Sequence, residues 1–204
     1  MSFNVGITGT GSLIGQAIIK SIIKSDYSKD YNLIGLDYFH DTVGSFLCKK
    51  NYVLPDVYKN KNLKKKWLET IMKIILNEKL DILFVGVDFE LLLFANYKHQ
   101  IELKTKCKVI ISTSDVIKTG NDKFLTYKFL KDNKLNYPKT FLPNQLNYDK
   151  IKFPIIVKPR IGARSVNVYK VYNLDDLKEK IKIVDRPIIQ ELIGNEFNEY
   201  TCGI

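Results

Sequence analysis

The sequence predicts an α/β protein with a Rossmann-like parallel sheet over residues 1–113 and a second domain over residues 114–204. Three observations lead to this prediction. Short apolar runs, typical of buried strands, alternate with helical patterns in the first part. A glycine-rich turn joins the first strand to the first helix. The residues 112–115 are good helix N-caps, and no Gly/Ser-rich linker separates the two parts.

The first domain repeats a strand–helix unit. Strands are expected at 3–8, 31–36, 81–86 and 109–112, where β-branched and other apolar residues are concentrated. Helical spacing of apolar residues follows the first strand through Ile23, recurs over 63–76, and begins again near Leu91. Strands joined by such crossovers run parallel, so one twisted parallel sheet is expected.

The turn after the first strand contains Gly9, Gly11 and Gly15. One interpretation is a dinucleotide site, with the pyrophosphate at the helix N-terminus and Asp37 on a ribose, as in a nicotinamide-dependent oxidoreductase. The other is a tight turn that permits close helix–sheet packing. The spacing is one residue longer than the dinucleotide fingerprint, which favours the second interpretation.

Two carboxylates follow the strand at 81–86. Asp88 and Glu90 lie just beyond the carboxyl end of a parallel strand, where open α/β sheets bind ligands. They can hold a substrate amine there. Alternatively Asp88 caps the next helix, which is the role we favour.

Composition excludes several classes of protein. The net charge is +10, but its densest cluster, at 59–66, opens an amphipathic helix without aromatic–basic motifs, so no nucleic-acid partner is expected. No apolar run approaches the length of a membrane span, and the first residues do not resemble a signal peptide. Three widely spaced cysteines indicate a reducing, cytoplasmic location, and two histidines do not suggest a zinc site.

A basic hairpin organises the second domain. The buried run 155–157 ends in Lys158, and the loop 159–165, which carries Arg164 and Ser165, leads to a second alternating strand. Small residues allow close approach of the backbone to a polyphosphate, and fixed cations offset its charge. Lys123, in the first turn of an earlier helix, opposes the helix dipole, which is plausible if a phosphate binds nearby.

The order of these motifs resembles the ATP-grasp superfamily, in particular the branch close to the carbamoyl phosphate synthetase large subunit. The resemblance rests on 122–131, 138–140, the hairpin at 153–168, and the segments 188–194 and 199–203. It implies a Rossmann-like pre-ATP-grasp domain at 1–113 and the N-terminal portion of an α+β ATP-grasp domain at 114–204.

The resemblance also implies an ATP site. Lys123 and Lys158 would reach the phosphates, under a lid loop that includes Arg164 and Ser165. Mg²⁺ would accompany ATP, with its ligands expected outside this chain, so no metal ligand is assigned within it.

The base and ribose would be held by the following strand. Glu191 would lie at the adenine edge, and the main chain of Leu192 and Ile193 would pair with the ring. Glu199 would accept from the ribose hydroxyls, with Glu196 as the alternative.

The implied activity is ligation of a carboxylate to an amine or ammonia through an acyl phosphate. Because the expected metal ligands are missing, we expect a truncated domain: a fragment of a longer ligase, or a split subunit completed by a partner chain or a homodimer. The alternative is a non-catalytic nucleotide-binding subunit. The catalytic residues and the two substrates cannot be assigned from this sequence.

Overall fold

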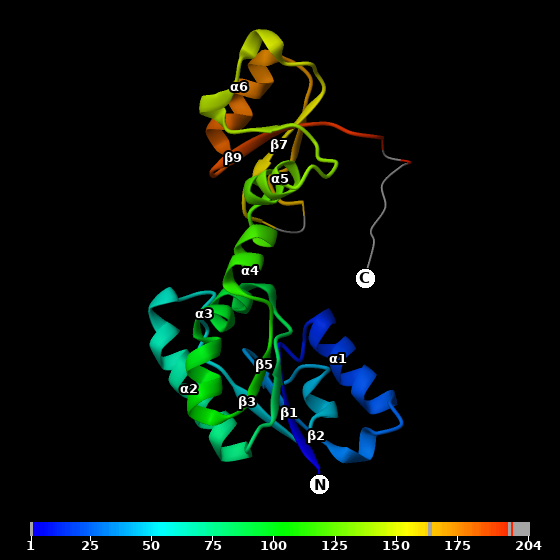
Figure 1. Cartoon of the computed structure of the whole chain (residues 1–204), viewed down its shortest axis with the longest axis vertical. Coiled ribbons are helices and arrows are strands. Elements are labelled where there is room, and N and C mark those ends of the chain that lie inside the picture. Colours follow the sequence, from blue (N-terminus) through cyan, green and yellow to red (C-terminus); the bar gives the residue numbers. More distant parts are fainter. Residues whose placement is uncertain (1, 163–164, 196, 198–204) are drawn as a thin grey trace. The chain divides into compact units, whose positions relative to one another are not determined.

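The structure is a computed structural model, and it describes residues 2–162, 165–195 and 197. The chain forms two compact units, Met1–Ile117 and Lys118–Ile204 (Figure 1). Both the mixed α/β class and the parallel sheet expected for the first part of the chain are confirmed.

The first unit contains one five-stranded parallel sheet in the order β3-β2-β1-β4-β5. Its strands are β1 (Phe3–Thr8), β2 (Tyr31–Asp37), β3 (Lys50–Val53), β4 (Ile82–Phe84) and β5 (Lys108–Ile110). The edge strand β3 was not predicted, because its sequence is polar and short and all four of its residues are at least partly exposed.

Three helices cover this sheet: α1 (Leu13–Lys24), α2 (Lys64–Glu78) and α3 (Asp88–Thr105). Ser12 caps α1, because its side chain accepts a hydrogen bond from the backbone N–H of Gly15. α2 and α3 each end at a lysine in the left-handed conformation, Lys79 and Lys106. Left-handed residues commonly terminate helices, although glycine is the usual choice.

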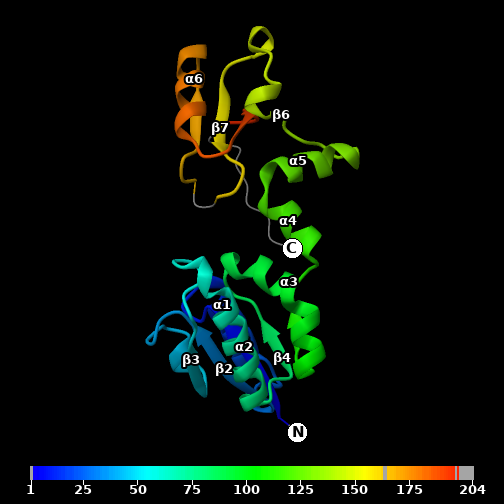
Figure 2. The same ribbon diagram turned by 90° about the vertical axis from the view of Figure 1, so that its left-hand side faces the viewer.

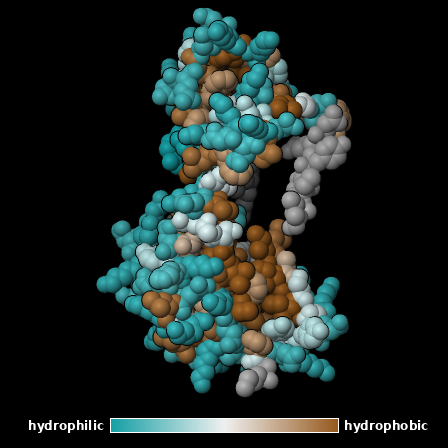
Figure 3. All heavy atoms as spheres, in the orientation of Figure 1, coloured by the Kyte–Doolittle hydropathy of each residue, from teal (hydrophilic) through white to brown (hydrophobic). Residues whose placement is uncertain are grey.

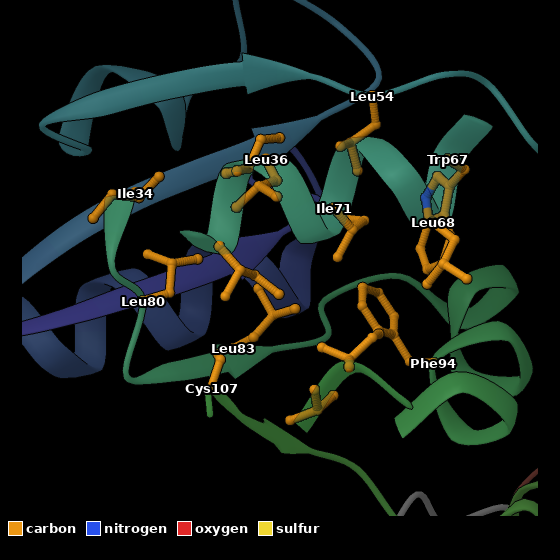
Figure 4. Close-up of a cluster of buried hydrophobic side chains, with 14 of the residues drawn as sticks. Ile34, Leu36, Leu54, Trp67, Leu68, Ile71, Leu80, Leu83, Phe94 and Cys107 are labelled. Carbon is orange, nitrogen blue, oxygen red and sulfur yellow. The ribbon is translucent and has the colours of Figure 1, made fainter. Parts of the chain in front are cut away.

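α2 and α3 lie on one face of the sheet, over the larger hydrophobic core (Figure 4). α2 buries Trp67, Leu68 and Ile71 at helical spacing. The indole of Trp67 packs edge-on against Phe94 of α3, with ring centroids 4.7 Å apart. This core joins both helices to strands β2, β4 and β5.

α1 lies on the other face, over a smaller core that includes Ile7 and Ile19. Figure 3 shows an apolar area on the surface of the first unit near this helix. The exposed large apolar side chains of the first unit include Leu13 and Ile14 of α1 and Ile110 of the edge strand β5. In the part of the chain that the structure describes, no helix is long and apolar enough to cross a membrane.

The second unit contains an antiparallel sheet in the order β6-β9-β7-β8. Its strands are β6 (Thr140–Phe141), β7 (Ile155–Pro159), β8 (Tyr169–Val171) and β9 (Pro187–Glu191). Helices α4 (Ser114–Asn121), which contains the boundary between the units, and α5 (Lys123–Asp132) precede it, and α6 (Leu174–Ile183) follows β8. Asn173 caps α6, because its side chain accepts a hydrogen bond from the N–H of Asp176.

The sheet of the second unit has two different faces. Ile155 and Val157 of β7 are buried with Leu177 of α6, which lies alongside the strands (Figure 2). Side chains alternate along a strand, so Ile156 and Lys158 occupy the opposite face. This alternation presents Lys158 away from the core.

Candidate functional site

A cavity of about 280 Å³ lies at the end of β7, and its walls come from the elements predicted to hold phosphates. It is lined by Lys123, Lys158, Pro159, Gly162, Ser165, Val166 and Val168. Two of these side chains are cationic, and among the described residues that line the cavity none is acidic. The cavity is therefore suited to an anion.

Lys158 is held at the penultimate position of a strand. Its Nζ donates a hydrogen bond of 2.7 Å to Oε1 of Gln190 on the neighbouring strand β9. β7 and β9 pair antiparallel, with Val157 opposite Ile189 and Lys158 opposite Ile188. The ammonium is thus positioned by a rigid sheet, which reduces the side-chain entropy that binding would cost.

Lys123 approaches the same cavity from a helix N-terminus. It is the first residue of α5, and Asp122 is the N-cap, whose carboxylate accepts from the N–H groups of Phe124 and Leu125. Nζ of Lys123 donates to the carbonyl oxygen of Gly162 at 2.8 Å. The helix start is therefore joined directly to the hairpin loop.

The two ammonium groups repel one another. Burial lowers the pKa of Lys158, and the charge of Lys123 lowers it further. Burial also lowers the pKa of Lys123, and the nearby Asp122 offsets part of this effect. Two close cations in a partly desolvated cavity favour a bound anion, because it relieves their repulsion.

Arg160, which follows β7, forms an ion pair with Asp122 and does not line the cavity. Its guanidinium pairs with Asp122, with Nη2 2.6 Å from Oδ2, and it lies over the ring of Phe124 at 5.4 Å from the centroid. Its backbone carbonyl accepts from the N–H of Lys123 at 2.9 Å. Arg160 therefore secures the start of α5, and its charge is already compensated.

The loop residues of the predicted site are only partly described. Ser165 lines the cavity, and its φ of 54° lies in the left-handed region, which is uncommon outside glycine. Arg164, Glu196 and Glu199 lie outside the described residues.

Glu191 lies on the other face of the sheet from Lys158. It is paired directly with Ile155, a core residue, and its Oε1 accepts from the N–H of Lys139 at 2.7 Å. Leu192 and Ile193 continue from β9 without regular secondary structure. The expectation that these three residues bind adenine remains a prediction.

Gln190 is a candidate that the sequence analysis missed. It shares the face of Lys158, since the two side chains are hydrogen bonded across β7 and β9. The period of two along a strand was the available signal, because the neighbouring residues Gln190 and Glu191 must point to opposite faces of the sheet. Deciding which of the two residues shares the face of Lys158 requires the register between β7 and β9, and neither strand's sequence alone determines that register.

In the first unit, the carboxylate of Asp37 is satisfied internally. Oδ2 accepts from the N–H of Gly11 at 2.8 Å and from the hydroxyl of Thr10 at 3.1 Å. Oδ1 accepts from the N–H groups of Tyr38 at 2.6 Å and Phe39 at 3.2 Å. These four bonds use both carboxylate oxygens and tie them to the turn and its neighbouring loop.

Gly15 of this turn and Gly86, which follows β4, permit close packing. A Cβ on Gly15 would lie 2.1 Å from the carbonyl oxygen of Gly9, and one on Gly86 would lie 2.3 Å from that of Thr8. Ser12 Oγ bridges the same segments by donating to the carbonyl of Gly86 at 2.7 Å. This geometry favours the tight-turn interpretation over the dinucleotide site.

Asp88 and Glu90 have different environments. We had expected Asp88 to cap α3, and this prediction was wrong. Val87 occupies the N-cap, and Asp88 is the first residue of the helix. Glu90 is fully buried, and its Oε1 accepts from the hydroxyl of Tyr38 at 2.6 Å. Burial raises the pKa of Glu90 to about 7. A contact between Glu90 and a substrate amine is not supported by this burial.

Metal ligands do not gather in the described parts of the chain. Within residues 2–162, 165–195 and 197, no group of three or more His, Cys, Asp or Glu side chains is arranged to hold a metal ion.

Comparison with known proteins supports the resemblance to the ATP-grasp superfamily. Residues 120–197 match the family model of the ATP-grasp domain. D-alanine--D-alanine ligase B of Clostridium perfringens is 30% identical over 155 residues, which cover 66% of this chain and 50% of that protein. Carbamoyl-phosphate synthase of Methanobrevibacter smithii is 24% identical over 123 residues, covering 58% of this chain and 34% of that protein. The chain spans about half the length of the first of these relatives.

Solved structures share the fold. An L-amino acid ligase from Bacillus licheniformis superposes with a TM-score of 0.71 at 14% identity, over 94% of this chain and 44% of that one. N5-carboxyaminoimidazole synthetase from Staphylococcus aureus complexed with ADP gives a TM-score of 0.68 at 16% identity, over 95% of this chain and 48% of that one.

Proposed function

Because residues 120–197 match the family model of the ATP-grasp domain, we propose that the cavity between Lys123 and Lys158 binds the phosphates of ATP. The observation that carries this proposal is the convergence of two mutually repelling ammonium groups in one cavity without an acidic partner in its described lining. The chain then forms part of an ATP-dependent carboxylate–amine ligase.

In this reaction a carboxylate oxygen attacks the γ-phosphorus of ATP, ADP leaves, and an amine or ammonia displaces phosphate from the acyl phosphate. Positioning and charge stabilisation dominate phosphoryl transfer. Lys123 and Lys158 would orient the polyphosphate and offset its charge. The main chain at Leu192 and Ile193 would pair with adenine, Arg164 would cover the phosphates, and Glu199 or Glu196 would bind the ribose.

Mg²⁺ does not fit the residues that line this cavity. It prefers carboxylate and other oxygen ligands, whereas the side-chain charges of the described lining are two ammonium groups. We therefore assign no step to a metal held by these side chains.

The test is binding of ATP and ADP by titration calorimetry with EDTA present, so that the protein's own groups are measured. Lys123→Ala and Lys158→Ala are each expected to weaken binding by roughly tenfold or more, since hydrogen bonds to charged groups contribute about 1.5–3 kcal/mol. Lys182→Ala, in an exposed position on α6, is the matched control. Equal affinity in all four proteins would refute the proposal.

A further inference from the structure

Gln190 lies between the cavity and the edge of the sheet. Its Oε1 accepts from Nζ of Lys158 at 2.7 Å, and its Nε2 donates to Oγ1 of Thr140 at 2.8 Å. These two bonds cross three strands, β7, β9 and β6. The amide therefore links the edge strand to a lysine of the cavity.

The orientation of this amide is determined by Thr140. The hydroxyl of Thr140 donates its one proton to the carbonyl oxygen of Pro138 at 2.9 Å, and the residue is 2% exposed. Toward Gln190 the hydroxyl oxygen can only accept, so the amide nitrogen must face it. The amide oxygen is consequently directed at Lys158.

Among the described residues, the cations near the cavity fall into two groups. Arg160 is neutralised by the carboxylate of Asp122. Lys123 and Lys158 are held by uncharged oxygens, the carbonyl of Gly162 and the amide of Gln190. An uncharged acceptor fixes the position of an ammonium group but leaves its charge available to an anion.

We propose that Gln190 is a positioning residue that holds Lys158 toward the phosphates of a nucleoside polyphosphate, and that its lack of charge determines the affinity of the cavity. The inference rests on the proposed function. It deepens that function by assigning a role to a residue one position away from Glu191. A carboxylate at position 190 would form an ion pair with Lys158 and compete with the phosphates.

The experiment measures the binding of inorganic tripolyphosphate by calorimetry at several salt concentrations, which isolates the phosphate contacts from any contact with the base. Gln190→Glu is expected to bind roughly tenfold or more weakly than the parent chain. Its binding should also depend less on salt, because one fewer cation is available to the anion.

Two further variants separate charge from position. Gln190→Met keeps the length of the side chain but removes the oxygen that accepts from Lys158. The ammonium group then loses the hydrogen bond that orients it but keeps its charge. Tripolyphosphate binding should therefore weaken about threefold, with its salt dependence unchanged. Thr140→Val should behave similarly, because the amide can then rotate. Thermal unfolding of each variant identifies any that fail to fold. If Gln190→Glu fails to fold, the affinities of Gln190→Met and Thr140→Val still decide the test.

The outcomes separate the two proposals. If the parent chain binds neither ATP nor tripolyphosphate, the proposed function fails. If the parent chain binds both, while folded Gln190→Glu and Gln190→Met retain its affinity and salt dependence, the role of Gln190 is overturned and the phosphate site stands.

Discussion

The buried carboxyl of Glu90 should make the stability of the first unit depend on pH. Burial raises its pKa from 4.5 to about 7, and the charge of Asp37 acts in the same direction. A raised pKa means that the folded state holds the proton more strongly than the unfolded state. The resulting stabilisation is complete below about pH 4.5 and is lost as the pH rises through about 7.

The magnitude follows from the same values. A change in pKa of one corresponds to 1.36 kcal/mol, so a pKa raised from 4.5 to about 7 corresponds to about 3 kcal/mol. Burial is the largest cause of the raised pKa, and hydrogen bonds to the carboxyl, including the one from Tyr38, offset only part of it, while Oε2 has no hydrogen-bond partner among the described residues. Glu90→Gln should abolish this dependence, because the amide does not titrate.

The assay is urea unfolding of the full chain at pH 5, 6, 7 and 8. Trp67 is the only tryptophan and is fully buried in the first unit, so its fluorescence reports on that unit. The difference in unfolding free energy between parent and Glu90→Gln should shift by about 2.5 kcal/mol over this range, in favour of the variant at high pH, because part of the full effect is already present at pH 5. Glu69→Gln, on the exposed side of α2, is the control. Parallel pH profiles for parent and Glu90→Gln would refute the reasoning.

Two predictions concern backbone packing and capping. Gly15→Ala should lower the unfolding free energy by roughly 3 kcal/mol or more, because its Cβ would meet the carbonyl of Gly9 at 2.1 Å. Gly120→Ala, with nothing within 4 Å of its Cβ, should instead gain about 0.5 kcal/mol, and equal urea midpoints for the two would contradict this. Asp122→Asn keeps the cap of α5 but loses the ion pair with Arg160, so it should melt between the parent and Asp122→Ala, which loses both. Melting of Asp122→Asn at or below Asp122→Ala would show that the cap contributes nothing.

Local sequence was sufficient for several parts of the site. Lys158 stands at the end of an apolar run, and Lys123 directly follows a residue that caps a helix well. Each of these signals depends on neighbours along the chain, so each could be read without a structure. The edge strand β3 and the role of Arg160 could not, because both depend on residues that are distant in sequence.

The sequence by itself determined the α/β class, the parallel sheet of the first unit and the basic hairpin of the second, because apolar periodicity and turn residues act locally. Only the tertiary structure decided which side chains share the cavity. The antiparallel register of β7 and β9 places Gln190 beside Lys158 and turns Glu191 to the opposite face. A shift of one residue in that register would exchange the two, and the choice is made by burial of Ile155, Val157 and Ile189 against α6.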